Sequence, residues 1–379
     1  MERRIHTILL ALAVGSTSIA AQQPVATRLD GSNLTPQQID AAVTGAMKSA
    51  NVTGAGIAVF HDGSIVYLQA YGLRDTEKGM PLTPDTVMAA ASLSKAAFAT
   101  VVMRLVQQRV LDLDKPIYQY LPKPLSEYPS YADLKGDERS KKLTLRNLLS
   151  HTSGFPNWRW FEDDHKLKIH FELGTRYAYS GEGIQLAQLV VETVTGESLT
   201  TLMDDDLFHP LGMTRTSMIW EAPFESDFAN GYDEHGHSLG SQRRTKPGAA
   251  GSMQTTLHDY ATFLSAVMRR QILDEKTSDE MLSPQIKIHS AHQFPSLAPE
   301  TTTANDAIDL SAGLGWGLYT SSYGRAFFKG GYDDGWRHQG LCFRNGSGML
   351  IMTNSSNGDK IFKPLFDSIL GKTSFPFDW

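Results

Sequence analysis

The sequence predicts an α+β fold, an α/β sandwich in which an antiparallel β-sheet is built from both ends of the chain and an all-helical domain is inserted between them. Strand patterns near the N-terminus, helical patterns and polar loops in the middle, and strand patterns again near the C-terminus support this prediction. Such an order is typical of a sheet whose two halves come from opposite chain ends. We expect helices from both chain ends to flank the sheet, which covers about 50–90 and 312–379, and the helical insertion to cover about 92–310.

Composition and charge narrow the class of protein. The chain has 379 residues, of which 41% are hydrophobic and 20% charged, which is enough apolar material for a packed core. Its net charge of −6 gives no electrostatic reason to bind nucleic acid. The single cysteine, Cys342, cannot form an intramolecular disulfide or a cysteine cluster. Since the sequence shows no metal-ligand spacing or nucleotide motif either, we expect no metal and no organic cofactor.

The N-terminus has the pattern of a cleavable signal peptide. A basic head, Met1–Arg4, precedes an apolar run, Ile5–Gly15, that is too short to span a bilayer, and small residues follow it. We assign 1–21 to a signal peptide and 35–379 to one domain. The alternative is a membrane anchor or a core helix. We expect a periplasmic or secreted protein with no membrane span in the mature chain.

Local signals place the first elements. A helix opens with a threonine that can cap it, followed by a proline suited to the first turn. Two strand patterns then flank an Asp-Gly pair, the strongest short-range signal for a hairpin. A later stretch has apolar residues on nearly every face, which predicts a helix buried inside the protein. We therefore expect a helix at 35–50, strands at 56–60 and 64–71, and the buried helix at 92–108.

The remaining elements follow from the same signals. Helical patterns cover 184–195, with Gly196 suited to end the helix, and 257–271. Two long polar stretches, 222–251 and 285–309, are of the kind that forms functional walls or lids in a compact domain. The C-terminal part predicts strands at 315–320, 325–329, 337–343 and 348–353, with Asn345-Gly346 as a turn, and a helix at about 359–370.

A hydroxyl and an amine stand together at the start of the buried helix. Ser92 and Lys95 are three residues apart, so they share one face of the helix. The positive end of the helix dipole and burial both lower the pKa of a lysine in this place, which suits it to act as a base. We therefore favour Ser92 as a nucleophile activated by Lys95. The alternative is that Ser92 only caps the helix and that Lys95 reaches water.

A second serine matches a different nucleophile motif. Gly236-His-Ser238-Leu-Gly240 fits the Gly-x-Ser-x-Gly elbow of α/β hydrolases. That elbow requires a hydrophobic strand before it and a helix after it, whereas both flanks here are polar. We expect Ser238 to lie in an exposed loop and not to act as the nucleophile.

Two further motifs are ambiguous alone. Tyr179 precedes the helix at 184–195, so it would project from a loop at a helix N-terminus; taken alone, it would be interpreted as a core tyrosine. Lys329 is followed by Gly330 and Gly331, which would end a strand and let a ligand or another backbone come close. The alternative is a simple turn with a solvated lysine.

Taken together and in order, these motifs resemble the serine β-lactamase and penicillin-binding-protein superfamily, especially the class C β-lactamase-like branch that includes family VIII esterases and D-aminopeptidases. The resemblance covers nearly the whole mature chain. It also rests on Leu143-Thr-Leu-Arg-Asn-Leu-Leu-Ser-His-Thr-Ser-Gly154, Pro210-Leu-Gly-Met213 and Gly315-Trp-Gly317. It implies a β-lactamase/transpeptidase-like fold and a serine hydrolase, which the N-terminal pattern predicts to be exported.

The resemblance implies a role for each residue. Ser92 would be the acylated nucleophile, and Lys95 would take its proton. Tyr179 would share the general-base work, including activation of the water that hydrolyses the acyl-enzyme, and Lys329 would supply positive charge beside it. The backbone N–H groups of Ser92 and Tyr332 would form the oxyanion hole, in which each donor typically contributes roughly 3 to 4 kcal/mol.

The sequence departs from the family pattern in two places. Gly181 stands where the family commonly has an asparagine, and Gly330, followed by Gly331, stands where it often has a threonine or serine. Side-chain groups that would bind the acyl amide and the carboxylate of a β-lactam are therefore missing. Because a site without such groups does not select its substrate well, we expect hydrolysis of an ester or a peptide-like amide instead of efficient β-lactam hydrolysis. The alternatives are a class C-like β-lactamase or D,D-peptidase, and a non-turnover penicillin-recognising sensor. We treat His151 as structural, and the sequence does not indicate an oligomeric state.

Overall fold

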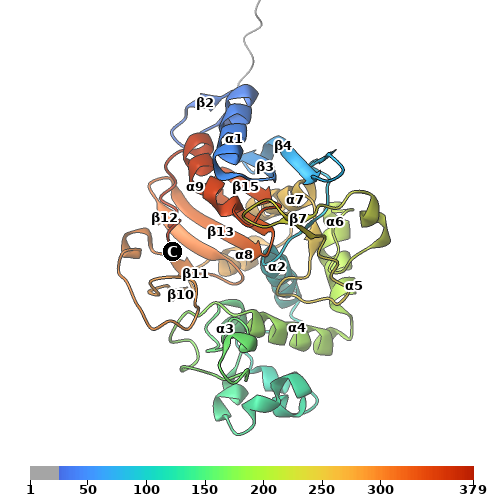
Figure 1. The fold of residues 1–379 in the computed structure, drawn as a ribbon. Helices are drawn as coiled ribbons and strands as arrows, with labels where there is room; N and C mark the ends of the chain where they lie inside the picture. The colour runs from blue at the N-terminus through green and yellow to red at the C-terminus, as the bar shows by residue number, and fades with distance from the viewer. Residues whose placement is uncertain (1–24) are drawn as a thin grey trace, which may run out of the picture.

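The structure is a computed structural model that describes residues 25–379 (Figure 1). The segment assigned to a signal peptide, 1–21, lies outside the described residues. Within them, no helix is both long and apolar enough to cross a bilayer.

A nine-stranded antiparallel sheet forms the centre of the described chain. Its two halves meet where β15 pairs with β3, with Ile351 opposite Ile57. Strands from opposite chain ends therefore complete one sheet, which confirms the predicted fold class. In spatial order the strands are β10 (Ile286–Lys287), β11 (Ser311–Ala312), β12 (Gly317–Ser321), β13 (Gly324–Asp333), β14 (Trp336–Phe343), β15 (Gly348–Thr353), β3 (Gly54–His61), β4 (Ser64–Asp75) and β5 (Met80–Pro81).

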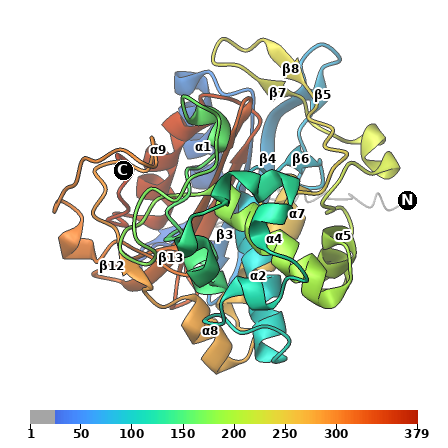
Figure 2. The same cartoon turned by 90° about the horizontal axis from the view of Figure 1, so that it is seen from below.

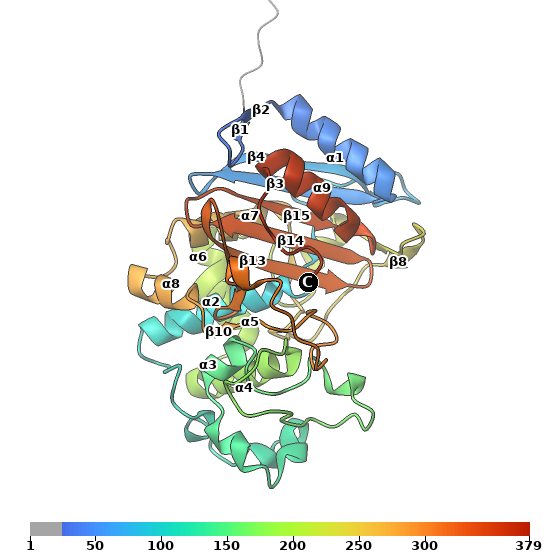
Figure 3. The same cartoon turned by 90° about the vertical axis from the view of Figure 1, so that its left-hand side faces the viewer.

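Helices cover both faces of the sheet. On one face lie α1 (Pro36–Ala50) and α9 (Phe362–Leu365), on the viewer's side of the sheet in Figure 3, and on the other lie α2 (Leu93–Gln107) and α7 (Leu257–Met268). Successive residues of β3 point to opposite faces: Ile57 joins the core under α1, whereas Ala58 joins the core around α2. The sheet is thus buried on both sides.

The segment between β5 and β11 contains helices joined by short 3₁₀ turns, and two ladders of two strands each accompany them. Besides α2, α7 and β10, the helices and strands of this segment are α3 (Leu145–Leu149), α4 (Gly181–Thr195), α5 (Leu199–Met203), α6 (His209–Leu211), α8 (Glu275–Met281), the pair β6 (Met88–Ala89) and β9 (Gln254–Thr255), and the hairpin β7 (Gly231–Tyr232) and β8 (Ser238–Gly240). The segment places α3 and α4 below the sheet in Figure 1, whereas α6 lies level with the sheet; Figure 2 shows the molecule from below. A further pair, β1 (Ala26–Thr27) and β2 (Asn33–Leu34), precedes α1.

Local chemistry explains how several elements begin and end. The Thr35 side chain accepts a hydrogen bond from the Gln38 backbone and caps α1, as expected. Asp62 and Gly63 between β3 and β4 both have positive φ, 48° and 72°, which is the backbone of a type I′ hairpin turn. Gly196 ends α4 with φ 73°.

Three sequence predictions are wrong in detail. β13 does not end at Lys329, because Gly330 and Gly331 continue the ladder opposite Gln339 and His338. The C-terminal helix is divided, since a 3₁₀ turn precedes α9 and a π-helical turn, Phe366–Leu370, follows it. Ser238 lies on strand β8 and not in a loop, although it is exposed as predicted.

Candidate active site

The first turn of α2 holds Ser92 at the surface of a cavity. Ala91, just before it, has φ 47°, a left-handed conformation that is sterically costly for a residue with a Cβ. The Ser92 side chain makes no capping hydrogen bond to α2. The structure therefore does not give Ser92 the capping role that was the alternative to a nucleophile.

Lys95 is buried beneath Ser92. Its side chain is 1% exposed, and its Nζ lies 2.9 Å from Ser92 Oγ and 2.6 Å from the carbonyl oxygen of Ala250, to which it donates. Burial lowers the pKa of Lys95 to about 8; Tyr179 opposes this shift and the nearby charge of Lys329 adds to it. Lys95 is therefore a desolvated amine in contact with the serine hydroxyl, and it does not reach water.

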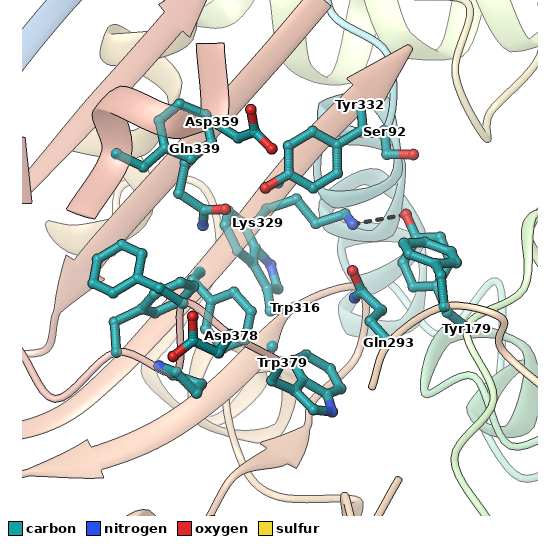
Figure 4. Close-up of a pocket in the computed structure, with 18 of the residues that line it drawn as sticks. Ser92, Tyr179, Gln293, Trp316, Lys329, Tyr332, Gln339, Asp359, Asp378 and Trp379 are labelled. Carbon is teal, nitrogen blue, oxygen red and sulfur yellow. Dashed lines mark hydrogen bonds between the residues drawn. The ribbon is translucent and has the colours of Figure 1, made fainter. Parts of the chain in front are cut away.

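Tyr179 and Lys329 complete a cluster with Ser92 and Lys95. Lys329 Nζ donates a hydrogen bond of 2.9 Å to Tyr179 OH, the dashed line in Figure 4. The Lys95 ammonium position lies 5.0 Å from the centroid of the Tyr179 ring. Burial lowers the pKa of Lys329 to about 7. Four residues from α2, from the loop before α4 and from β13 thus meet at one place.

His151 lies directly against this cluster. Its ring centroid is 4.5 Å from that of Tyr179, and its Nδ1 accepts a hydrogen bond from the backbone N–H of Ser180. Burial, together with the positive charges of Lys329 and Lys95, lowers the pKa of His151 well below its ordinary value. A neutral imidazole therefore packs on Tyr179 and fixes the backbone next to it.

The cluster opens into a cavity of about 480 Å³, the catalytic pocket (Figure 4). Such a volume suits a small organic molecule. Aromatic rings form much of its wall, and residues of the predicted wall 285–309 contribute to it. Lining residues include Ser92, His151, Trp158, Tyr177, Tyr179, Gln293, Phe294, Trp316, Lys329, Tyr332, Gln339 and residues 375–379.

A second cavity of about 320 Å³ also borders Ser92. The other long polar stretch, 222–251, lines it with Arg244 and Lys246, and Trp158 and Tyr332 line both cavities. Both stretches therefore contribute to walls beside the cluster.

Gly331 allows β13 to approach the start of α2, and Gly330 leaves space for a side chain of β14. A Cβ at position 331 would lie 2.7 Å from the carbonyl oxygen of Ala90 and 3.2 Å from the backbone nitrogen of Leu93. At position 330 it would lie 3.0 Å from Gln339 Oε1. Gly331 thus brings Tyr332, the next residue, close to the first turn of α2.

Trp158 fills the space beside Gly181. A Cβ at position 181 would lie 2.6 Å from carbons of the Trp158 indole, and Trp158 stacks on Trp160 with their ring centroids 4.6 Å apart. Because the φ of Gly181 is not in the left-handed region, the glycine is required for space and not for backbone conformation. An aromatic face therefore occupies the place expected of an asparagine side chain.

We expect Gly181→Asn to lower the free energy of unfolding by about 2 kcal/mol, because the new side chain overlaps Trp158. Removing the indole should relieve the overlap, so Trp158→Ala and Gly181→Asn should couple by about 1 kcal/mol or more in a double-mutant cycle. Urea unfolding of the four proteins measures this. If Gly181→Asn lowered the free energy of unfolding equally in the presence and absence of Trp158, the steric explanation would be contradicted.

Some residues of this site had no signal in the sequence. Trp158, Gln293 and residues 375–379 match no motif, although the aromatic run Phe375-Pro-Phe-Asp-Trp379 is apparent once its position is known. Ser238 lies in the β7–β8 hairpin and lines neither cavity. Within residues 25–379, no group of three or more His, Cys, Asp or Glu side chains is arranged to hold a metal.

Comparisons with known proteins agree with this architecture. The chain is 29% identical over 230 residues to Esterase EstB of Burkholderia gladioli, covering 54% of this chain and 56% of that protein. It is 25% identical over 222 residues to Protein flp of Staphylococcus aureus (strain NCTC 8325 / PS 47), covering 55% of this chain and 42% of that protein. The matches thus span about half the length of these curated relatives.

Two solved structures share the fold at 20% sequence identity. They are the octameric penicillin-binding protein homologue from Pyrococcus abyssi, with a TM-score of 0.71 over 88% of this chain and 77% of that chain, and the D-alanine carboxypeptidase AmpC from Burkholderia cenocepacia, with a TM-score of 0.69 over 88% and 98%. The beta-lactamase family model matches residues 39–371, nearly the whole described chain. The chain therefore belongs to the beta-lactamase family, a hydrolase family of the serine β-lactamase and penicillin-binding-protein superfamily.

Proposed function

We propose that this protein is an exported serine hydrolase that forms an acyl-enzyme on Ser92 and hydrolyses a carboxylic ester or a peptide-like amide. The observation that supports it most is the 2.9 Å contact between the buried Lys95 amine and Ser92 Oγ. Burial lowers the pKa of Lys95 to about 8, so a useful fraction is unprotonated near neutral pH and can accept the serine proton. The basic and apolar pattern within 1–21 supports export.

Acylation follows from the arrangement of the cluster. Ser92 Oγ attacks the carbonyl carbon of the substrate as its proton passes to Lys95. The negative charge that develops on the carbonyl oxygen is stabilised by the backbone N–H groups of Ser92 and Tyr332, each contributing about 3 kcal/mol. Tyr179, hydrogen-bonded to Lys329, then delivers a proton to the departing alcohol or amine, and the C–O or C–N bond breaks.

Deacylation reverses these roles. Tyr179 takes a proton from a water molecule that attacks the acyl carbon, and the bond to Ser92 Oγ breaks as that oxygen takes back the proton held by Lys95. Lys329 stabilises the phenolate form of Tyr179 during this step, because its Nζ lies within hydrogen-bond distance of the phenol oxygen. The neutral His151 ring supports Tyr179 without competing for the proton.

Gly181 and Gly330 favour esters or simple amides over β-lactams as substrates. Neither residue supplies a side-chain group for the amide or carboxylate of a β-lactam, and Trp158 covers the first position with an apolar ring. The match to an esterase, EstB, supports the same substrate class.

Intact-mass measurement after mixing with 4-nitrophenyl acetate or benzylpenicillin tests the proposal. We expect ester turnover, an acetyl adduct on the acid-quenched protein that Ser92→Ala lacks, and no lasting penicillin adduct. A stable penicillin adduct on Ser92 would instead indicate a non-turnover sensor or a slow D,D-peptidase, and rapid penicillin turnover a β-lactamase. Ester turnover that survives Ser92→Ala would contradict the proposal.

A further inference from the structure

The position of the proton donor in the proposed mechanism determines which of the two cavities beside Ser92 receives the leaving group. A group that protonates the departing alcohol or amine must lie within hydrogen-bond reach of it. Tyr179 and Lys329 line the catalytic pocket, and neither lines the second cavity beside Ser92. The leaving group must therefore occupy the catalytic pocket, while the acyl group extends towards the second cavity.

Residues 375–379 form one wall of that pocket and are held in place by packing and a hydrogen bond. The Phe375 ring meets Phe328 of β13 edge to face, with their centroids 4.9 Å apart. Trp379 Nε1 donates a hydrogen bond of 3.0 Å to the carbonyl oxygen of Ser290, and its ring lies 5.9 Å from that of Tyr177. The wall is thus attached to the sheet at one end and to the 285–309 stretch at the other.

An exposed aromatic ring faces the proton donor from the 285–309 stretch. Phe294 is 44% exposed and meets Tyr179 edge to face, with the ring centroids 5.4 Å apart. Both rings and Trp379 line the same pocket, in which Figure 4 shows Tyr179 and Trp379. Large apolar groups left exposed next to a reactive centre indicate a surface that a ligand covers. Since offset and edge contacts favour flat rings, the matching ligand group is a planar ring.

The charged side chains of the pocket outside the catalytic cluster do not favour a leaving group of either charge. Besides Lys329, the charged side chains that line the pocket are Asp359, Lys360, Lys363 and Asp378, and the formal charges of these four cancel. Outside the cluster that contains Lys329, the pocket lining therefore offers ring faces and edges and no net formal charge to the group that enters.

We propose that Trp379, with Phe294, determines leaving-group specificity and that the enzyme prefers esters or amides whose leaving group carries a planar aromatic ring. This inference rests on the proposed function. It concerns what leaves and not how the acyl-enzyme forms.

The test compares two substrates, benzyl acetate and cyclohexylmethyl acetate. They share the acyl group, but the leaving group of the first carries a planar ring and that of the second a puckered ring. Titration of the acetic acid released measures the rate of hydrolysis of each ester. We expect kcat/KM of the wild type to favour the benzyl ester about fivefold or more. In Trp379→Ala, kcat/KM for the benzyl ester should fall about fivefold while that for the cyclohexylmethyl ester changes less than twofold. Trp379→Phe should recover most of the preference.

Controls separate the possible failures. Phe294→Ala removes a half-exposed ring and should reduce the same ratio, so the proposal remains testable should Trp379→Ala fail to fold. Tyr118→Ala, which removes an exposed ring outside both cavities, should leave the ratio unchanged. An unaltered ratio in both wall variants, or no benzyl preference in the wild type, overturns the inference. If hydrolysis of both esters is unaffected by Ser92→Ala, the proposed function itself fails.

Discussion

Ser92→Ala is expected to lower kcat for 4-nitrophenyl acetate by at least about 10⁴-fold, because loss of a covalent nucleophile removes the whole acyl-enzyme route. Lys95 would then have no hydroxyl to deprotonate, although its 2.6 Å hydrogen bond to the Ala250 carbonyl keeps it in place. The fold should remain intact, since Ser92 makes no capping hydrogen bond. Initial rates and circular dichroism spectra of both proteins measure the two effects.

Ser238→Ala is the matched control. Ser238 belongs to the rival Gly-x-Ser-x-Gly motif, but it is exposed on β8 and lines neither cavity beside the cluster. We expect this variant to retain wild-type rates. If Ser238→Ala lost activity and Ser92→Ala kept it, the assignment of the nucleophile would be wrong.

Elements with strong local signals could be predicted closely. The strand expected at 348–353 matches β15 residue for residue, and Asp62-Gly63 forms the expected turn between β3 and β4. The buried helix predicted at 92–108, which begins with Ser92 and Lys95, differs from α2 by one residue at each end. In each case the side-chain period or a turn residue with positive φ determines the local backbone.

Other elements depend on partners far away in the chain, and local patterns do not contain that information. Gly330 and Gly331 suggest the end of a strand, yet β13 continues through them because β14 pairs with both residues. The polar stretch 222–251 gives no clear strand signal, yet part of it pairs as β7 and β8.

The candidate site also contains residues that local patterns predict and residues that depend on long-range packing. Ser92 and Lys95 can be paired from helical spacing alone, because they are one turn apart. That Lys329 reaches Tyr179 requires the pairing of β13 with its neighbours and the docking of α4, which no short-range pattern specifies. Trp158 was missed for a related reason: only the close approach of its indole to Gly181 reveals that the two positions share one space.

Lys329→Met is expected to stabilise the protein while reducing its activity. Lys329 is 6% exposed and burial lowers its pKa from an ordinary value near 10.5 to about 7. Folding therefore imposes a cost on the charged form, which an apolar side chain of similar length avoids. After allowing for the lost hydrogen bond to Tyr179, we expect a gain of about 2 to 4 kcal/mol near pH 6, which raises Tm by about 5 °C or more.

The stability gained by Lys329→Met must be larger at low pH than at high pH. Between pH 10.5 and about 7 the unfolded lysine holds a proton that the folded one has released, so the stability of the wild type falls as the pH falls through this window. The advantage of Lys329→Met should therefore be complete below pH 7 and vanish near pH 10.5. Urea unfolding at pH 6, 8 and 10 measures it, with Lys141→Met, an exposed lysine paired with Glu138, as the control.

Activity should change in the opposite direction. Without Lys329, Tyr179 OH loses the donor that stabilises its phenolate form, so kcat for 4-nitrophenyl acetate should fall by about 10²-fold or more. A variant that gains stability and loses catalysis together is the pattern expected of a buried charge kept for function. A loss of stability at pH 6 in Lys329→Met would contradict the cost assigned to burying the amine, and an unchanged kcat would contradict the proposed role of its charge beside Tyr179.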